Sequence, residues 1–221
     1  YGGEFAGWRT AFSAQLADTN GQKEKINADA QTFYDNFFPP GVSLAPGGVN
    51  TGKQSLDVRG DIEKGRWHIR AGYQSRKDVE TAAGAFSALD NKGTADANRY
   101  NADITYQNKD FLENWDIKAQ YSFFNSITRS NLTLLPAGTF GGAFPDGVIG
   151  EPDVYERHNR IDLSAFYTGF NQHDIRIGAG FHHQDQYKIE EKKNFYITPG
   201  PMILRVSSWL RCGRCLRYHT V

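Results

Sequence analysis

The chain has 221 residues, of which 39% are hydrophobic and 23% charged, a composition that permits a buried core. Its 25 basic and 25 acidic residues give a formal net charge of zero, so nucleic acid is not expected as a partner. Aromatic residues make up 14% of the chain and favour β structure. No apolar run approaches the roughly 20 residues that a membrane helix needs.

The first predicted strand lies in residues 5–18, where alternate positions from Trp8 to Leu16 are largely apolar and those between them are polar or small. A second stretch, residues 55–74, shows the same alternation on both sides of Lys64 and Gly65. A period of two indicates strands with one apolar and one polar face. The break at Lys64 and Gly65 predicts a hairpin turn.

Four later stretches repeat this pattern and bring the number of predicted strands to seven; they are residues 98–107, 115–124, 160–169 and 174–183. Short turns are expected near Lys64, at 108–114 and at 170–173, with long loops at 19–54, 75–98 and 125–159. Such regular alternation of short and long connections is typical of an antiparallel up-and-down meander.

The apolar faces raise the question of which medium they contact. Tryptophans stand near the short-turn ends of their strands, and tyrosines also lie on apolar faces near strand ends, as expected of interfacial aromatic belts. A soluble β-sandwich is the alternative, with these rings in its core. With little helix left to cover seven strands, the sequence favours an all-β fold that is an open segment of a transmembrane β-barrel.

This interpretation assigns a set of side chains to the lipid, which are Trp8, Phe12, Trp67, Ile69, Tyr73, Ile104, Trp115, Ile117, Tyr121, Leu163 and Ile177. The opposite face is polar and carries five candidates for ligand contact, which are Arg59, His68, Arg70, Arg176 and His182. Carboxylates on that face are expected to form ion pairs across strands. Because His182 and His183 are adjacent on a strand, they point to opposite faces and do not form a metal site. The sequence predicts neither a catalytic site nor a cofactor.

Several phrases resemble the barrel region of TonB-dependent outer-membrane receptors of Gram-negative bacteria. They are "ADTNGQKEKINADAQT", "DIEKGRWHIRAGYQSRKD", "TLLPAGTFGGAFPDGVIGEPDVYERHNRIDLSAFYTGF" and "DIRIGAGFHHQD". The resemblance covers residues 1–200. It implies a parent barrel of about 22 strands whose lumen is closed by an N-terminal plug. This chain shows no plug and no energy-coupling box, so it is expected to be a segment from the first half of the barrel.

The resemblance also implies a function. The parent protein would take up a scarce small-molecule ligand, such as a siderophore, cobalamin or saccharide, across the cell outer membrane. Its partners would be outer-membrane lipid, the ligand and the inner-membrane TonB energy-transducing complex. A passive porin or small outer-membrane barrel remains an alternative, as does a soluble β-sandwich binding module. Residues 201–221 depart from the pattern, because they lose the alternation and gain Arg, Cys212 and Cys215. They are expected to be an aberrant tail, the product of a frameshift or assembly artefact.

Overall fold

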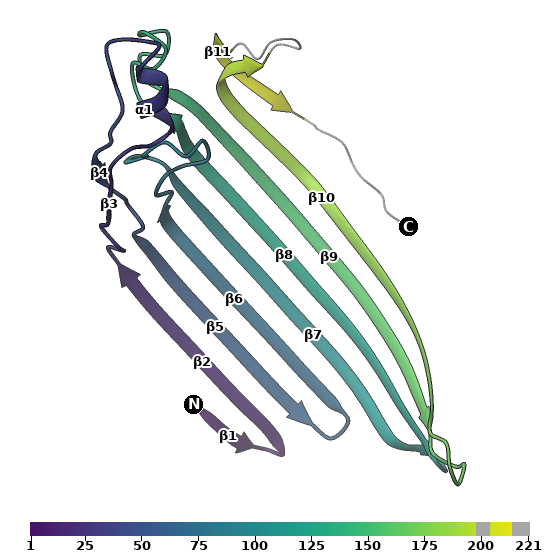
Figure 1. Ribbon diagram of the computed structural model, residues 1–221. Coiled ribbons are helices and arrows are strands. Elements are labelled where there is room, and N and C mark those ends of the chain that lie inside the picture. The colour runs from purple at the N-terminus through teal and green to yellow at the C-terminus, as the bar shows by residue number, and fades with distance from the viewer. Residues whose placement is uncertain (198–203, 214–221) are drawn as a thin grey trace.

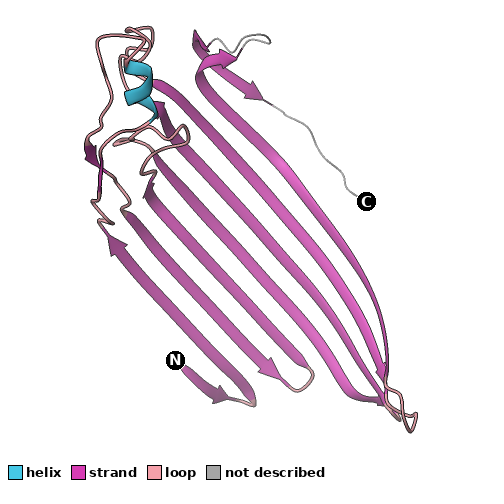
Figure 2. Ribbon diagram, viewed as in Figure 1, coloured by secondary structure: helices cyan, strands magenta, loops and turns pink. Residues whose placement is uncertain are grey.

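The computed structural model describes residues 1–197 and 204–213. Nine strands form one antiparallel sheet in the order β1-β2-β5-β6-β7-β8-β9-β10-β11 (Figures 1 and 2). Their bounds are β1 Gly2–Phe5, β2 Trp8–Thr19, β5 Lys53–Lys64, β6 Trp67–Glu80, β7 Thr94–Leu112, β8 Trp115–Leu135, β9 Val148–Tyr167, β10 Ile175–Ile197 and β11 Leu204–Gly213. Each strand pairs with its sequence neighbours in the sheet, which confirms the all-β meander predicted from the alternation.

The remaining elements are short and lie in the connection between β2 and β5. They are β3 Lys25–Ile26, α1 Ala30–Asp35 and β4 Gly47–Gly48, and β3 pairs with β4. None of the helical segments in the described residues has the length and apolar character that a membrane-spanning helix needs. In the described part of the chain, β1 and β11 form the two edges of the main sheet and do not pair with each other.

All short turns lie at one end of the sheet, and the long connections lie at the other (Figure 1). The β1–β2 hairpin turns at Ala6 and Gly7, whose φ angles of 50° and 73° fit a two-residue turn that needs positive φ at both positions. The β5–β6 hairpin pairs Lys64 with Trp67, and the β7–β8 hairpin pairs Leu112 with Trp115. The predicted turn at Gly65 is therefore confirmed.

Two predicted loops are shorter than expected. Strands β6 and β7 continue to Glu80 and from Thr94, so their connection spans 81–93 rather than 75–98. Strands β8 and β9 continue to Leu135 and from Val148, so the next connection spans 136–147 rather than 125–159. Toward the long connections apolar residues no longer keep to one face, as the adjacent Leu134 and Leu135 show, which removes the period of two. The backbone ladder continues nonetheless, because its hydrogen bonds do not depend on side-chain polarity.

The predicted tail is also described in part. Residues 204–213 form β11 and pair with the end of β10, from Glu190↔Gly213 to Ile197↔Leu204. Cys212 belongs to this strand, and Cys215 lies outside the described residues. The prediction of an aberrant tail over 201–221 otherwise falls on residues 201–203 and 214–221, which also lie outside the description.

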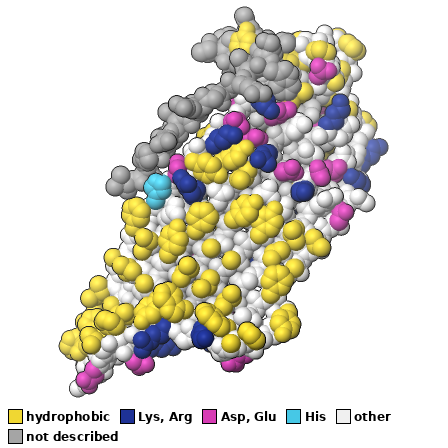
Figure 3. Space-filling model, turned by 180° about the vertical axis from the view of Figure 1, so that it is seen from behind, with side chains coloured by type: hydrophobic (Ala, Val, Ile, Leu, Met, Phe, Trp, Pro, Cys, Tyr) yellow, Lys and Arg dark blue, Asp and Glu magenta, His cyan; other side chains and the backbone are white. Residues whose placement is uncertain are grey.

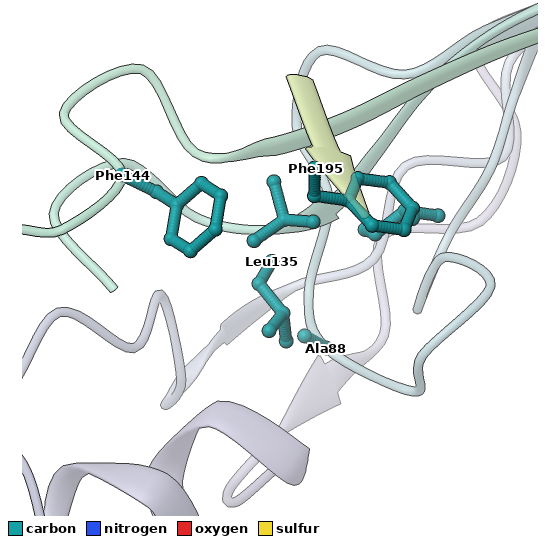
Figure 4. Close-up of a cluster of buried hydrophobic side chains, with 6 residues drawn as sticks. Ala88, Leu135, Phe144 and Phe195 are labelled. Atoms are coloured by element: carbon teal, nitrogen blue, oxygen red, sulfur yellow. The ribbon is translucent and has the colours of Figure 1, made fainter. Parts of the chain in front are cut away.

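The three long connections, 20–52, 81–93 and 136–147, fold together at one end of the sheet, and we call them the loop cap. A small buried cluster joins the cap to the ends of the strands; its members are Ala88, Leu134, Leu135, Phe144, Val148 and Phe195 (Figure 4). Gln31 is fully buried beside it and accepts a hydrogen bond of 2.7 Å from Thr139 Oγ1. The loops therefore have a core of their own.

Asp29 links two of these connections. Its carboxylate accepts hydrogen bonds from the backbone N–H of Thr32 at 2.8 Å, where it caps α1, and from the backbone N–H of Leu89 at 2.7 Å. The hydroxyl of Ser43 donates a third bond at 2.8 Å. Burial, the largest single influence, opposes ionisation, but the hydrogen bonds outweigh it together and lower the pKa of Asp29.

Candidate functional site

The main sheet has one apolar face that continues across its strands. Cross-strand pairing aligns apolar side chains into rows, because directly opposed residues lie on the same face. One row across β5 to β10 consists of Ile62, Ile69, Ile104, Tyr121, Ile161 and Phe181. We call this surface the apolar band. All side chains that the sequence assigned to the lipid lie on it by register.

The apolar band is exposed in the described part of the chain. Phe12 is 54% exposed, Leu163 53%, Ile177 59% and Phe181 63%. Figure 3 shows hydrophobic side chains gathered over this face, with charged side chains toward both ends. A patch extending across seven strands is far larger than the few hundred Å² of apolar surface usual for a soluble monomer. This face therefore requires an apolar medium or partner.

Aromatic rings border the band at the short-turn end. The rings of Trp67 and Tyr106 lie 5.0 Å apart between centroids, and those of Trp115 and Tyr167 lie 4.9 Å apart. The ammonium of Lys64 lies 5.1 Å from the ring centroid of Trp8. These residues place rings and a cation at one level of several strands, an arrangement typical of a membrane interface.

A second ring system borders the band toward the loop cap. The rings of Tyr73 and Tyr100 lie 4.9 Å apart, and the Tyr73 hydroxyl donates a 2.9 Å hydrogen bond to Asn98 Oδ1. The Tyr121 hydroxyl donates a similar bond of 2.8 Å to Asn159 Oδ1. These tyrosines have their rings on apolar neighbours and their hydroxyls on polar ones. Trp67 and Tyr73 are six positions apart on β6, which is roughly 20 Å along a strand.

The opposite face is polar and is linked by ion pairs across strands. Arg76 Nη2 lies 2.9 Å from Asp57 Oδ2, and Arg9 Nη2 lies 2.6 Å from Glu63 Oε1. Such partly exposed pairs contribute little stability individually, up to about 1 kcal/mol. They do neutralise much of the charge on this face. The predicted pairing of its carboxylates is confirmed at these positions.

The structure divides the five predicted ligand-contact residues into two groups. Arg59 and Arg70 line one shallow depression of about 510 Å³, where Arg70 pairs with Asp103 at 3.6 Å. His68 lies near this depression, and its Nε2 is 2.9 Å from Asp61 Oδ2. Arg70 and His68 are therefore each paired with a carboxylate.

The second group, Arg176 and His182, lies on β10. Arg176 lines another depression of about 540 Å³ together with Lys118 and Arg160, two residues that were not predicted as ligand contacts. His182 opposes Arg160 on β9 and its ring lies 5.7 Å from that of His158. Lys118 and Arg160 occupy alternate positions that belong to the polar face of their strands. This alternation is the sequence signal that could have identified them as candidates for ligand contact. His182 and His183 fall on opposite faces, as predicted.

Across residues 1–197 and 204–213, no group of three or more His, Cys, Asp and Glu side chains is arranged to hold a metal ion. No protein-family model matches the sequence, and neither a curated protein nor a solved structure matches it. The features of the described residues that bear on function are the two faces of the sheet and the loop cap.

Proposed function

We propose that this chain forms part of the wall of a transmembrane β-barrel in the outer membrane of a Gram-negative bacterium. The apolar band contacts lipid, and the polar face lines the lumen. The observation that carries this proposal is the exposed apolar face, which continues from strand to strand between two aromatic ring systems. Lipid chains cover such an apolar face, and closure of the barrel provides hydrogen-bond partners for the backbone N–H and C=O groups at the sheet edges.

A soluble β-sandwich needs a second layer of structure over the apolar band. In the described residues, side chains such as Leu163 and Ile177 are more than half exposed, so no such layer is present there. The inward face also has the character of a water-filled lumen rather than of a core, because charged and hydroxyl side chains line its depressions. Both features favour the membrane barrel over the sandwich.

Within this class we propose a TonB-dependent receptor that takes up a scarce ligand with energy delivered from the inner membrane. The resemblance of residues 1–200 to the barrel region of such receptors supports this proposal. The loop cap supports it as well, because folded connections at the mouth of a barrel provide a surface for ligand capture.

The membrane assignment is tested by cell fractionation and by the accessibility of inserted tags. The protein should enter the outer-membrane fraction and resist extraction by salt and carbonate. A tag at Gly142, an exposed glycine of the loop cap, should be labelled on intact cells, whereas a tag at Gly65 should not. Recovery of a monomer that stays soluble without detergent overturns the barrel proposal, and the reverse labelling pattern overturns the orientation.

Energy coupling is tested by genetics. Deletion of the gene should slow growth only when one nutrient is scarce, and removal of the energy-transducing protein should cause the same defect. A defect that follows deletion of the gene alone would instead support a passive porin.

A further inference from the structure

We propose that the polar face carries a subsite for an anionic group, built from Lys118 on β8, Arg160 on β9 and Arg176 on β10. The inference rests on the proposed function, because it takes the polar face to line an aqueous lumen. The ligand group would be a carboxylate or phosphate of a polyvalent anion. The three cations line one depression of about 540 Å³.

The strand register places these cations along one depression of the polar face. Lys118 opposes Ser164, and Ser164 opposes Gly178. Lys118, Ser164 and Gly178 therefore form one row across β8, β9 and β10. Arg176 lies two residues before Gly178 on the same face of β10. Arg160 lies four residues before Ser164 on the same face of β9. Because β9 and β10 are antiparallel, Arg160, opposite His182, and Arg176, opposite Phe166, lie on either side of this row, so the depression that the three cations line extends along the strands.

Two of the three cations are held by neighbours that leave donors available. The Arg176 guanidinium lies 5.1 Å from the ring centroid of Phe166, the residue it opposes on β9. Stacking on a ring leaves the in-plane N–H groups of an arginine free to donate. Arg160 donates through Nε and Nη2 to Asp162 at 2.6 and 2.9 Å, which leaves its Nη1. The side chains are therefore oriented before any ligand binds.

The floor of the depression is formed by small residues. Gly178 and Gly180 are exposed, and a Cβ added at Gly180 would lie 3.1 Å from Asp162 Oδ1. Side chains at these positions would fill the space between the cations. Ser164 adds a hydroxyl that can donate to an anion. The site combines an open floor with cationic and hydroxyl donors along its length.

Charge balance distinguishes this depression from the one at Arg59. The latter has two cations, Arg59 and Arg70, and two carboxylates, Asp61 and Asp103, in its lining. The subsite has three cations and a single carboxylate, Asp162, in its lining. Within the described residues, neither Lys118 nor Arg176 forms an ion pair with a carboxylate. The excess positive charge attracts anions to this part of the face.

The test is titration of the full chain in detergent micelles with citrate, a trivalent carboxylate, followed by calorimetry at low salt. The Arg176→Gln and Lys118→Gln variants should each weaken citrate binding by about tenfold or more, since each removes a charge-assisted hydrogen bond. Arg99→Gln is the matched control, because Arg99 is an exposed cation of the same face that lies outside the depression. It should change the Kd by less than about twofold.

Absence of citrate binding to the wild-type chain would overturn the subsite, as would equal losses in Arg176→Gln and Arg99→Gln. Detergent dependence of solubility, measured on the same preparations, separates this outcome from failure of the proposed function. A chain that needs detergent but binds no citrate contradicts the subsite alone. A chain that is soluble without detergent and binds citrate contradicts the proposed membrane barrel but is consistent with the anion subsite.

Discussion

Trp115 and Tyr167 lie directly opposite each other on β8 and β9, with ring centroids 4.9 Å apart, at the short-turn end of the apolar band. Both rings lie on the face that also carries Ile117 and Leu163. An indole has an apolar body and one N–H donor, so it is stable where hydrocarbon meets the polar head groups. If the proposed membrane assignment holds, this pair lies at the level of the head groups.

The first prediction concerns the depth of Trp115. In vesicles, lipids brominated near the head group should quench its fluorescence more strongly than lipids brominated near the chain ends. The measurement is made with Trp115 as the single remaining tryptophan. A single tryptophan placed at Ile104, in the middle of the band, serves as the control and should show the opposite order. Equal quenching of both by the two lipids would contradict the assignment of the band to the bilayer.

The second prediction compares the two faces of β7. Ile104 is 42% exposed on the apolar band, and Asn101 is exposed on the polar face of the same strand. Ile104→Arg should lower the free energy of unfolding from lipid by about 2 to 4 kcal/mol, the cost of an arginine near the bilayer midplane. Asn101→Arg should change it by less than about 1 kcal/mol. Urea titration in vesicles measures both.

The same pair of variants distinguishes lipid from water as the medium. If the band faced water, Ile104→Arg would place a charge on an exposed surface and would cost little. Equal stability of the two variants would therefore show that the apolar band does not lie in a bilayer.

The sequence predicted the part of the sheet with alternating polarity because one physical signal dominates there. That Ile62, Ile69 and Ile104 lie on the apolar faces of their strands follows directly from apolar residues at every second position, and the strand pairing then aligns them in one row. That signal ends at Asn125, although β8 continues to Leu135. Beyond Asn125 the alternation no longer distinguishes a strand from a loop, so the predicted loop boundaries were wrong.

The loop cap and the cation cluster could not be predicted for a different reason. The hydrogen bond between Gln31 and Thr139 joins residues from the first and last long connections. A contact between segments so far apart in the sequence produces no periodic pattern in the residues around it. Likewise, Lys118 and Arg176 become neighbours of one depression only through the exact pairing of β8, β9 and β10. Their even positions on the strands predicted the face on which they lie. Only the pairing of the strands shows which residues they neighbour.

The third prediction concerns the buried hydrogen bond inside the loop cap. Gln31 and Thr139 are both fully buried, and Thr139 Oγ1 donates to Gln31 Oε1. Thr139→Val keeps the shape but leaves Gln31 Oε1 without this donor, at a cost of about 1 to 3 kcal/mol. Hydrogen exchange should accelerate in 20–52 and 136–147 while the sheet amides stay protected.

A double-mutant cycle separates this bond from simple loss of packing. Gln31→Met combined with Thr139→Val removes both polar partners, so the double variant should be more stable than the sum of the single effects predicts. Strictly additive effects would mean that the bond contributes nothing to the stability of the cap.

The last prediction is a pH dependence that is confined to the loop cap. The pKa of Asp29 is lowered in the folded cap, because its hydrogen bonds from Leu89, Thr32 and Ser43 together outweigh the opposing effect of burial. A carboxyl whose pKa is lower in the folded state stabilises that state above its unfolded pKa, about 4. This contribution is lost as the pH falls through the folded pKa.

Hydrogen exchange in 20–52 and 81–93 should therefore be constant from pH 7 to about 5, once corrected for intrinsic rates, and should accelerate below about pH 4. Asp29→Asn should be less protected at pH 7 and should lose part of this acid response, whereas Asp110→Asn, at the short-turn end, should retain all of it. The remainder comes from Asp35, where burial raises the pKa but hydrogen bonds from Gln31, Ser43 and Val42 together lower it. An acid response in Asp29→Asn as large as that of the wild type would show that other groups govern the opening of the cap.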